Sequence, residues 1–295
     1  MTFLVTGASG LLGATLSIVL RREGHTVFGT DRKTFDLQDD KSVSSWTSPS
    51  SGKIDVLIHT AAETDVALCE RDKELCLSVN ADGTRRVCSL AKRLGAHLLY
   101  VSTASVFSGK KGNYKANDTP EPVHWYDHSK ALGEKEALRY DKGYVVRLNL
   151  IGIHPNGSRG KNFFEWLYDS IMANADMKLF SDVRINPLSN WTTASFLLRI
   201  ADAAKPPRVL HFGTSDVVSK ADIGLCLINR LGNFKGNAHV ISVDQVSAVR
   251  RPKEMWLNTD ASARALGVTM PTVAEEIDTI FRHLIHSDEH TAHIV

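Results

Sequence analysis

The chain has 295 residues, of which 43% are hydrophobic and 23% are charged, and its formal net charge is +2. This composition is typical of globular proteins, and so small a net charge gives no support to binding of nucleic acid or of an anionic membrane. The apolar stretch from Met1 to Leu20 has no basic start and is interrupted by glycines, so it predicts neither a signal peptide nor a membrane-spanning helix.

The cysteines lack any Cys-x-x-Cys spacing; they are Cys69, Cys76, Cys88 and Cys226. This pattern favours reduced structural thiols in a cytoplasmic protein and argues against a zinc site. The tail, residues 286–295, contains three histidines, but a solvated, frayed end is a better interpretation than a metal site. We therefore expect no bound metal.

In the first half of the chain, short apolar runs alternate with amphipathic stretches, which predicts βαβ units and a parallel sheet. In chain order, we expect a strand at 2–6, a helix at 11–23, strands at 25–30 and 54–59, a helix at 73–94, a strand at 97–102, a helix at 126–140 and a strand at 144–148. Residues 103–125 are rich in Gly, Lys, Asn, Asp and Pro and predict a long loop after a strand, a setting that is often functional.

The alternation weakens after residue 150. We expect helices at 161–175, 192–203 and 220–231 and a further strand at 209–212. The predicted fold class is α/β, with a Rossmann-type, doubly wound parallel sheet followed by a smaller C-terminal lobe.

Three glycines, Gly7, Gly10 and Gly13, follow the first expected strand and open the first expected helix. In that position glycines permit a tight turn and the close approach of a pyrophosphate, and the helix N-terminus offers amide donors to phosphate oxygens. Asp31 ends the second strand, where an acid accepts hydrogen bonds from the adenosine ribose and favours NAD, whereas Arg32 could hold the 2′-phosphate of NADP. The two signals conflict, and NADPH or dual use is slightly favoured over NADH alone.

Tyr126 and Lys130 are spaced by four residues, so on a helix both side chains leave the same face. A free tyrosine titrates near pH ~10, and an ammonium about 4 Å away could supply up to about 4 kcal/mol at an effective dielectric near 20, with each pKa unit worth about 1.4 kcal/mol. We therefore expect Lys130 to bring the pKa of Tyr126 toward neutrality. Thr103, at the end of a strand, would complete the constellation.

Several motifs occur in one order along the chain: the glycine loop, HTAAETDV at 59–66, VNADGT at 79–84, STASVF at 102–107 and Tyr126-x-x-x-Lys130. In this order they resemble an extended short-chain dehydrogenase/reductase, and most closely the dTDP-4-dehydrorhamnose reductase group, which reduces the 4-keto group of nucleotide-linked 6-deoxysugars. The resemblance is specific over residues 1–150 and weaker through RLNL at 147–150, GKNF at 160–163, Arg251-Pro252 and Leu257-Asn258.

The resemblance implies a role for each matching position. Residues 1–150 would form the NAD(P)-binding domain, with its sheet completed by a strand near 209–214, and residues 151–285 would mostly form the substrate lobe. The implied cofactor-binding residues are Gly7, Gly10, Leu11, Leu12, Gly13, Asp31, Arg32, Asp36, Leu37, Ala62, Glu63, Thr64, Asn80, Val101, Tyr126 and Lys130. The implied catalytic residues are Thr103, Tyr126 and Lys130, with Thr103, Ala104 and Leu150 next to the substrate. For Thr64 and Asn80, a cap or packing hydrogen bond is an equally good interpretation.

The chain also departs from the group at two positions beside the expected substrate. Ala104-Ser105 replace an acid and a tyrosine, and Leu150 replaces a tryptophan. Basic residues that could bind substrate phosphates are Arg147, Arg159, Lys161, Arg184, Arg250 and Arg251, although long basic side chains usually stay solvated. Trp125 and Trp191 could stack on a base or sugar, although buried packing is commoner for tryptophan.

Two alternatives to the reductase stay open. One is a nucleotide-sugar epimerase of the same superfamily. The other is a non-catalytic, cofactor-binding regulatory subunit, because the regulatory subunit of methionine adenosyltransferase resembles the same group. The expected partner is a nucleotide-linked keto sugar, with no nucleic acid and no membrane, and a homodimer is compatible with the sequence.

Overall fold

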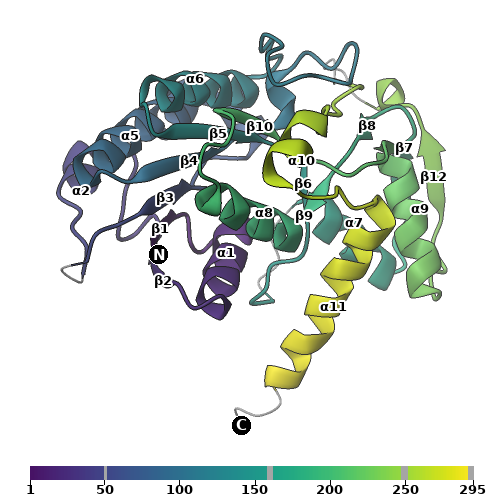
Figure 1. Ribbon diagram of the computed structural model, residues 1–295. Coiled ribbons are helices and arrows are strands. Elements are labelled where there is room, and N and C mark those ends of the chain that lie inside the picture. Colours follow the sequence, from purple (N-terminus) through teal and green to yellow (C-terminus); the bar gives the residue numbers. More distant parts are fainter. Residues whose placement is uncertain (50–51, 158–161, 247–251, 292–295) are drawn as a thin grey trace.

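The molecule is organised around a parallel sheet of six strands (Figure 1). The computed structural model describes residues 1–49, 52–157, 162–246 and 252–291. The strand order is β10-β5-β4-β3-β1-β2, and every neighbouring pair is parallel. The strands are β1 (Thr2–Thr6), β2 (Thr26–Thr30), β3 (Val56–His59), β4 (His97–Val101), β5 (Gly143–Arg147) and β10 (Val209–His211). This topology confirms the predicted Rossmann-type α/β fold.

Helices cover both faces of the sheet, as a doubly wound fold requires. α1 (Leu11–Arg22) and α8 (Asn190–Asp202) pack side by side on one face, and α2 (Asp40–Ser44), α5 (Gly83–Leu94) and α6 (Trp125–Arg139) lie on the other (Figure 1). The remaining elements of this half are α3 (Val66–Arg71), α4 (Lys73–Leu77), the π-helical turn η1 (Ser78–Asp82) and the 3₁₀ turn η2 (Ala104–Val106).

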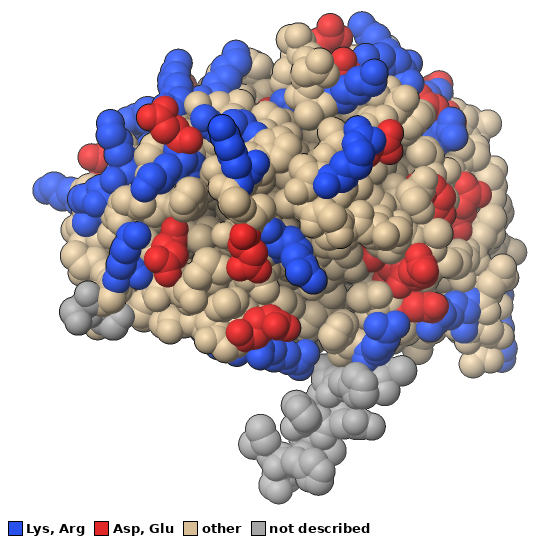
Figure 2. Space-filling model, viewed as in Figure 1, with Lys and Arg blue, Asp and Glu red and all other residues tan. Residues whose placement is uncertain are grey.

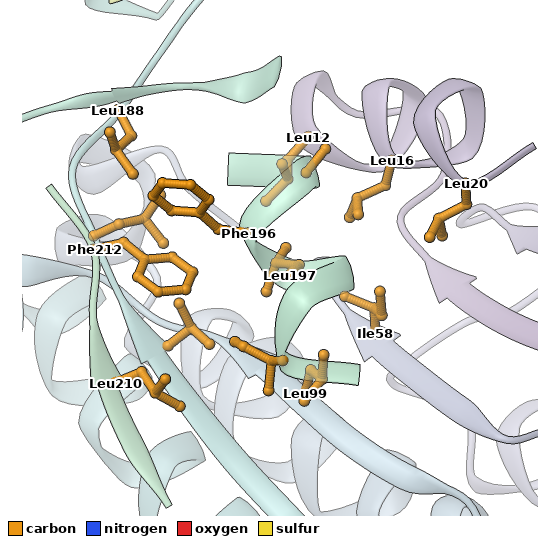
Figure 3. Close-up of a cluster of buried hydrophobic side chains, with 14 of the residues drawn as sticks. Leu12, Leu16, Leu20, Ile58, Leu99, Leu188, Phe196, Leu197, Leu210 and Phe212 are labelled. Atoms are coloured by element: carbon orange, nitrogen blue, oxygen red, sulfur yellow. The ribbon is translucent and has the colours of Figure 1, made fainter. Parts of the chain in front are cut away.

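The sheet is apolar because both of its faces are buried. Leu12, Leu16 and Leu20 of α1 point toward Phe196 and Leu197 of α8 and toward strand residues such as Ile58, Leu99 and Leu210 (Figure 3). A second cluster fills the opposite face and includes Leu4, Leu57, Val87, Leu98 and Tyr100. All four residues of β3 are buried, so the carboxyl ends of β1, β3 and β4 are held in fixed positions.

The second half of the chain adds a lobe with its own core. It contains β6 (Leu150–Ile151), β7 (Met177–Phe180), β8 (Arg184–Ile185), β9 (Leu188–Ser189), β11 (Val218–Ser219) and β12 (Ala238–Ile241). Its helices are α7 (Phe163–Met172), α9 (Lys220–Leu231), α10 (Asp260–Leu266) and α11 (Val273–Thr291), with a 3₁₀ turn η3 (Val243–Gln245). Buried side chains from α7, β7, α9 and α11, including Phe164, Leu179, Leu227 and Ile277, pack together.

The predicted elements agree with the structure to within one or two residues at most ends. The expected helix at 73–94 is instead α4, the π-helical turn η1 and α5 in succession. The helix expected at 161–175 is α7, and residue 161 lies outside the described residues. The sequence patterns did not predict α2, α3, α10, α11 or the short strands of the lobe.

Charged side chains of both signs are interspersed on the face shown in Figure 2. Within the residues that the structure describes, no helix is long and apolar enough to cross a bilayer. Across the same residues, no group of His, Cys, Asp and Glu side chains could hold a metal ion. The four cysteines are free thiols, and three of them are buried.

A buried ion pair joins α6 to the end of β5. The Glu134 and Arg147 side chains are 3% and 4% exposed, and Arg147 donates to the two carboxylate oxygens of Glu134 over 2.9 and 2.6 Å. Arg147 also donates to the carbonyl of Ala116 (3.3 Å) and lies 3.3 Å from Nε2 of His211. Burial and the Arg147 charge lower the pKa of His211 to about 3, so this histidine is neutral and its Nε2 can accept. Every charged group in this cluster is therefore hydrogen-bonded.

Replacing Arg147 by methionine would leave the Glu134 carboxylate buried without its partner. We expect the Arg147→Met variant to lose about 3–5 kcal/mol of unfolding free energy, measured by urea denaturation. The double variant Glu134→Leu/Arg147→Met removes both charges and should recover most of that loss. A single variant as stable as the wild type would show that the pair contributes nothing to the fold.

Candidate active site

The glycine loop at the end of β1 packs closely against the neighbouring backbone. Gly7 has a φ of +69°, and a Cβ there would lie 2.8 Å from the Cα of Ala61. A Cβ on Gly13 would lie only 2.1 Å from the carbonyl oxygen of Gly7. Gly10 caps α1 without a side chain, so the first amides of the helix, from Leu11 to Gly13, receive no side-chain cap. The loop is thus too closely packed for side chains at Gly7 and Gly13, and the helix N-terminus has no side-chain cap, which suits the pyrophosphate of a dinucleotide.

The residues expected at the adenosine half lie around the end of β2. Oδ1 of Asp31 accepts from the amides of Lys33 (3.0 Å) and Thr34 (3.1 Å) and from the Thr34 hydroxyl (3.0 Å). These hydrogen bonds, chiefly those from Thr34, lower the pKa of Asp31, which is ionised. Arg32 is exposed, Asp36 is half-buried, and Leu37 packs against Gly83 at the start of α5.

Asn80 braces the segment that follows β3. Its Oδ1 accepts from the amide of Glu63 (2.8 Å), and its Nδ2 donates to the Glu63 carbonyl (2.9 Å) and to the Ser129 hydroxyl (2.9 Å). Asn80 is 1% exposed, while Ala62 and Glu63 are half-buried and Thr64 is exposed. Asn80 therefore connects residues 62–64, which are expected to contact the cofactor, to α6. Its own side chain has almost no exposed surface that could contact a ligand.

Thr103, Tyr126 and Lys130 come together at the carboxyl end of β4. Lys130, on α6, is 4% exposed, and its Nζ donates to the carbonyl of Val101 over 2.8 Å. Nζ also lies 4.2 Å from the ring centre of Tyr100. Tyr126 and Thr103 are both half-buried, and η2, which begins immediately after Thr103, packs on α6. The helix and the strand end thus form one site, as the spacing of the motifs indicates.

The expected lowering of the Tyr126 pKa is wrong. Burial raises the pKa of Tyr126 above its ordinary value, and the neighbouring Asp127 carboxylate raises it further. Burial also lowers the pKa of Lys130 to about 7, against the opposing effect of Glu134. The cause is desolvation, which disfavours the charged form of each group and which sequence spacing does not reveal. The phenol of Tyr126 is accordingly protonated at neutral pH.

The two departures from the reductase pattern have different surroundings. Ala104 has no exposed surface and packs in an apolar cluster with Val106, Phe107, Tyr114 and Leu257, so its side chain offers nothing to a ligand. Leu150 is half-buried and begins β6, which pairs with β9.

The basic and aromatic candidates that lie within the described residues have other partners. Arg147 is the buried partner of Glu134, so the suggestion that it binds phosphate is wrong. Arg184 forms an ion pair with Glu254 at 3.7 Å, and Trp191 is 8% exposed and stacks on His283. Trp125 lies beneath the ammonium of Lys73. Arg159, Lys161, Arg250 and Arg251 lie outside the described residues.

Two features of the site were not predicted from the sequence. The Thr103 hydroxyl lies 2.9 Å from the Ser105 hydroxyl, and η2, which contains Ser105, packs on α6 although the two elements are distant in the sequence. The lobe also contains a cavity of about 600 Å³, lined by Phe163, Trp166, Asp176, Lys178, Phe180, Lys220 and Val246. The Phe163-x-x-Trp166 spacing, which places two aromatic rings on one helix face, was the available signal.

Comparisons with known proteins agree with this geometry. The family described as RmlD substrate binding domain matches residues 1–285. The chain is 30% identical to dTDP-4-dehydrorhamnose reductase of Mycobacterium tuberculosis over 222 residues, which covers 73% of this chain and 71% of that protein. It is 27% identical to the probable low-salt glycan biosynthesis reductase Agl14 of Haloferax volcanii, over 92% of this chain and 95% of that protein.

The fold has a close counterpart among solved structures. The dTDP-4-dehydrorhamnose reductase of Bacillus anthracis, solved in complex with NADP, superposes with a TM-score of 0.85 at 24% identity and covers 95% of this chain and 98% of its own. The family match spans almost the whole chain, including the glycine loop, Thr103 and the Tyr126–Lys130 helix. The chain therefore belongs to the RmlD substrate binding domain family.

Proposed function

We propose that this protein is an NAD(P)H-dependent reductase of the 4-keto group of a nucleotide-linked 6-deoxysugar. The observation that carries the proposal is the position of Thr103, Tyr126 and Lys130 at the end of β4, on the same edge of the parallel sheet as the glycine loop that follows β1. The names of the relatives support the same activity. Residues 1–150 would bind the cofactor, and most of 151–285 would bind the substrate.

The pKa directions support a proton donor in the direction of reduction. When bound, the dihydronicotinamide supplies a hydride to the ketone carbon. The Thr103 hydroxyl would donate a hydrogen bond to the ketone oxygen and stabilise the charge that develops there. Tyr126, whose raised pKa keeps its phenol protonated, would then give that oxygen a proton. Protonated Lys130, fixed on Val101, would stabilise the phenolate that remains.

The lobe cavity is a suitable site for the nucleotide of the substrate. The Phe163 and Trp166 rings are stacked with centroids 6.2 Å apart, and Nζ of Lys220 lies 4.8 Å from the Phe163 ring centre. Aromatic faces suit a nucleobase, and the ammonium groups of Lys178 and Lys220 suit phosphate oxygens.

A continuous run of backbone contacts connects this cavity to the loop after Thr103. Glu254 donates its amide to the Gly109 carbonyl (2.9 Å), Met255 donates to Arg184 (2.9 Å), and Lys220 donates to Val183 (2.9 Å). A nucleotide in the cavity and a sugar at Thr103 would thus be held by connected segments. A cytoplasmic location and a homodimer stay predictions.

The first test is reduction of a panel of nucleotide-linked 4-keto sugars with NADPH and NADH. The Tyr126→Phe variant removes the proton donor, so we expect kcat to fall by about 10³-fold, while the dissociation constant of NADPH changes little. Tyr140→Phe, on the same chain segment but with its hydroxyl on the Ala96 carbonyl, serves as the matched control and should keep full turnover. Near-normal turnover of Tyr126→Phe would exclude Tyr126 as the acid. Product formation without net cofactor oxidation would point to an epimerase, and activity on no sugar would point to a regulatory subunit.

The cavity makes a separate prediction. Trp166→Ala should raise KM for the nucleotide sugar about tenfold, because stacking of a base on an aromatic ring contributes about 1–3 kcal/mol, and should leave KM for NADPH unchanged. Met172, exposed on the same helix and absent from the cavity lining, provides the control Met172→Ala. Equal KM values for Trp166→Ala and its control would place the nucleotide elsewhere.

The choice of cofactor can be tested at Arg32. Oδ1 of Asp31 accepts from the turn at 33–34, and the neighbouring Arg32 is exposed, so its guanidinium could hold a 2′-phosphate. We expect Arg32→Ala to raise KM for NADPH about tenfold and to leave KM for NADH nearly unchanged, since a charge-assisted hydrogen bond contributes about 1.5–3 kcal/mol. Arg282→Ala removes an exposed charge from α11 and controls for net charge. A variant that binds both cofactors as the wild type does would count against Arg32.

A further inference from the structure

A histidine of the lobe contacts the glycine loop that follows β1. Nε2 of His154 lies 3.0 Å from the carbonyl oxygen of Ser9, although the two residues are 145 positions apart in the chain. The amide of Asn156 donates to Nδ1 of the same ring over 3.2 Å. A carbonyl oxygen only accepts and an amide N–H only donates, so the ring carries its proton on Nε2 and donates it to Ser9. His154 is 9% exposed, so these two hydrogen bonds and the surrounding packing hold the ring in one orientation.

This contact fixes a peptide group at the start of α1. The carbonyl of Ser9 and the amide of Gly10 belong to one planar peptide group and point in opposite directions. The Gly10 amide donates to the carbonyl of Gly7 over 2.9 Å, and His154 holds the opposite end of the group. Gly10 is the N-cap of α1, so this peptide group immediately precedes the amides at the helix N-terminus that would face a phosphate.

The segment that carries His154 is attached to both halves of the molecule. The His154 amide donates to Oε1 of Glu165 over 2.9 Å, and Glu165 is buried in the first turn of α7. Nδ2 of Asn190, at the start of α8, donates to the Thr15 hydroxyl of α1 over 2.8 Å and to the carbonyl of Ile153 over 3.3 Å. Hydrogen bonds therefore position His154 relative to both α1 and α7.

We propose that His154 is a positioning residue for the cofactor, whose Nε2–H group holds the Ser9–Gly10 peptide in the orientation that the pyrophosphate requires. This inference rests on the cofactor site of the proposed function and goes beyond it, because it gives a side chain of the lobe a role in cofactor binding. A site binds more tightly when supporting hydrogen bonds already hold its groups in the bound geometry. Without His154, the cofactor would have to order this peptide on binding. His154 would act through the backbone of Ser9 and not by touching the cofactor.

The test is the dissociation constant of NADPH, measured by fluorescence titration of the whole protein without substrate. Two carboxamide variants of His154 differ in reach by one methylene group. In His154→Gln the side-chain NH₂ can occupy the position of Nε2 and donate to Ser9, whereas in His154→Asn it reaches only the position of Nδ1. We expect His154→Asn to raise the dissociation constant about five- to tenfold, the effect of one lost hydrogen bond, and His154→Gln to stay within about twofold of the wild type.

A fragment of the cofactor shows which part of it depends on His154. The fragment 2′-phospho-ADP-ribose keeps the adenosine half and the pyrophosphate of NADPH and lacks the nicotinamide. His154→Asn should weaken binding of this fragment by the same factor as binding of NADPH. At saturating NADPH, kcat for the keto sugar should be unchanged in both variants, because the proposed catalytic groups lie at the end of β4 and on α6.

Two further variants separate positioning from stability. Ser219→Ala removes the side-chain cap of α9 at a buried position of the same lobe, so it should lower the unfolding free energy measured in urea and leave both dissociation constants unchanged. His154→Phe keeps a ring of similar size but has no donor, and it should weaken binding of both probes even if His154→Asn fails to fold.

Three results would overturn the inference. They are wild-type affinity for NADPH in His154→Asn and His154→Phe, equal weakening in His154→Gln and His154→Asn, or weakening of NADPH binding without weakening of binding of the fragment. The binding measurements need no substrate, so they decide the inference even if the wild type reduces no keto sugar, a result that would exclude the proposed function alone.

Discussion

The carboxylate of Glu134 is the point at which the segments of the catalytic site are joined. It accepts from the Ser102 hydroxyl over 2.6 Å and from Arg147, so the residue before Thr103 and the end of β5 are held on α6. Glu134 lies one helical turn beyond Lys130, and both therefore face the sheet. Buried charges are costly unless fully hydrogen-bonded, and here Ser102, Ala116 and His211 complete the network. The network thus connects the residue before Thr103 and the end of β5 to the helix that carries Tyr126.

Local sequence signals predicted the parts of the site that local structure determines. The glycine loop was predicted from spacing: Gly13 is required by its contact with Gly7 inside the turn, whereas the close contact of Gly7 is with Ala61, which follows β3 and is distant in the sequence. The pairing of Tyr126 and Lys130 follows from helix periodicity. The π-helical turn at 78–82 could not be predicted in this way, since Asn80 within it bonds to Glu63 and to Ser129, residues distant in the sequence. The packing of η2 on α6 and the lobe cavity also arise only after folding, from segments that are distant in the sequence.

The error in the Tyr126 pKa shows which physical effect decides the state of the site. Spacing implies an attraction of up to about 4 kcal/mol between a phenolate and an ammonium about 4 Å away. The spacing gives no information about the free-energy cost of removing the two charged groups from water. This cost raises the pKa of the phenol and lowers the pKa of the ammonium. In the folded chain, Lys130 is directed to Val101 and the Tyr100 ring, and burial dominates for both residues. The outcome is a neutral acid beside a lysine that titrates near neutrality, which suits delivery of a proton to an alkoxide.

The sheet and the lobe carry different parts of the candidate site, which explains why the reaction class is easier to infer than the identity of the sugar. The proposed proton donors and the glycine loop lie on segments that continue the strands of the parallel sheet or pack on it, and apolar clusters on both faces hold this sheet in place. The surfaces left to select a substrate are half-buried side chains such as Ser105 and Leu150 and the aromatic cavity of the lobe. Residues 252–256 hydrogen-bond both to the loop after Thr103 and to β8, so backbone contacts connect the lobe to the substrate side of that loop. Substitutions in the lobe can therefore alter which sugar is held against Thr103 without disturbing the groups that donate the proton.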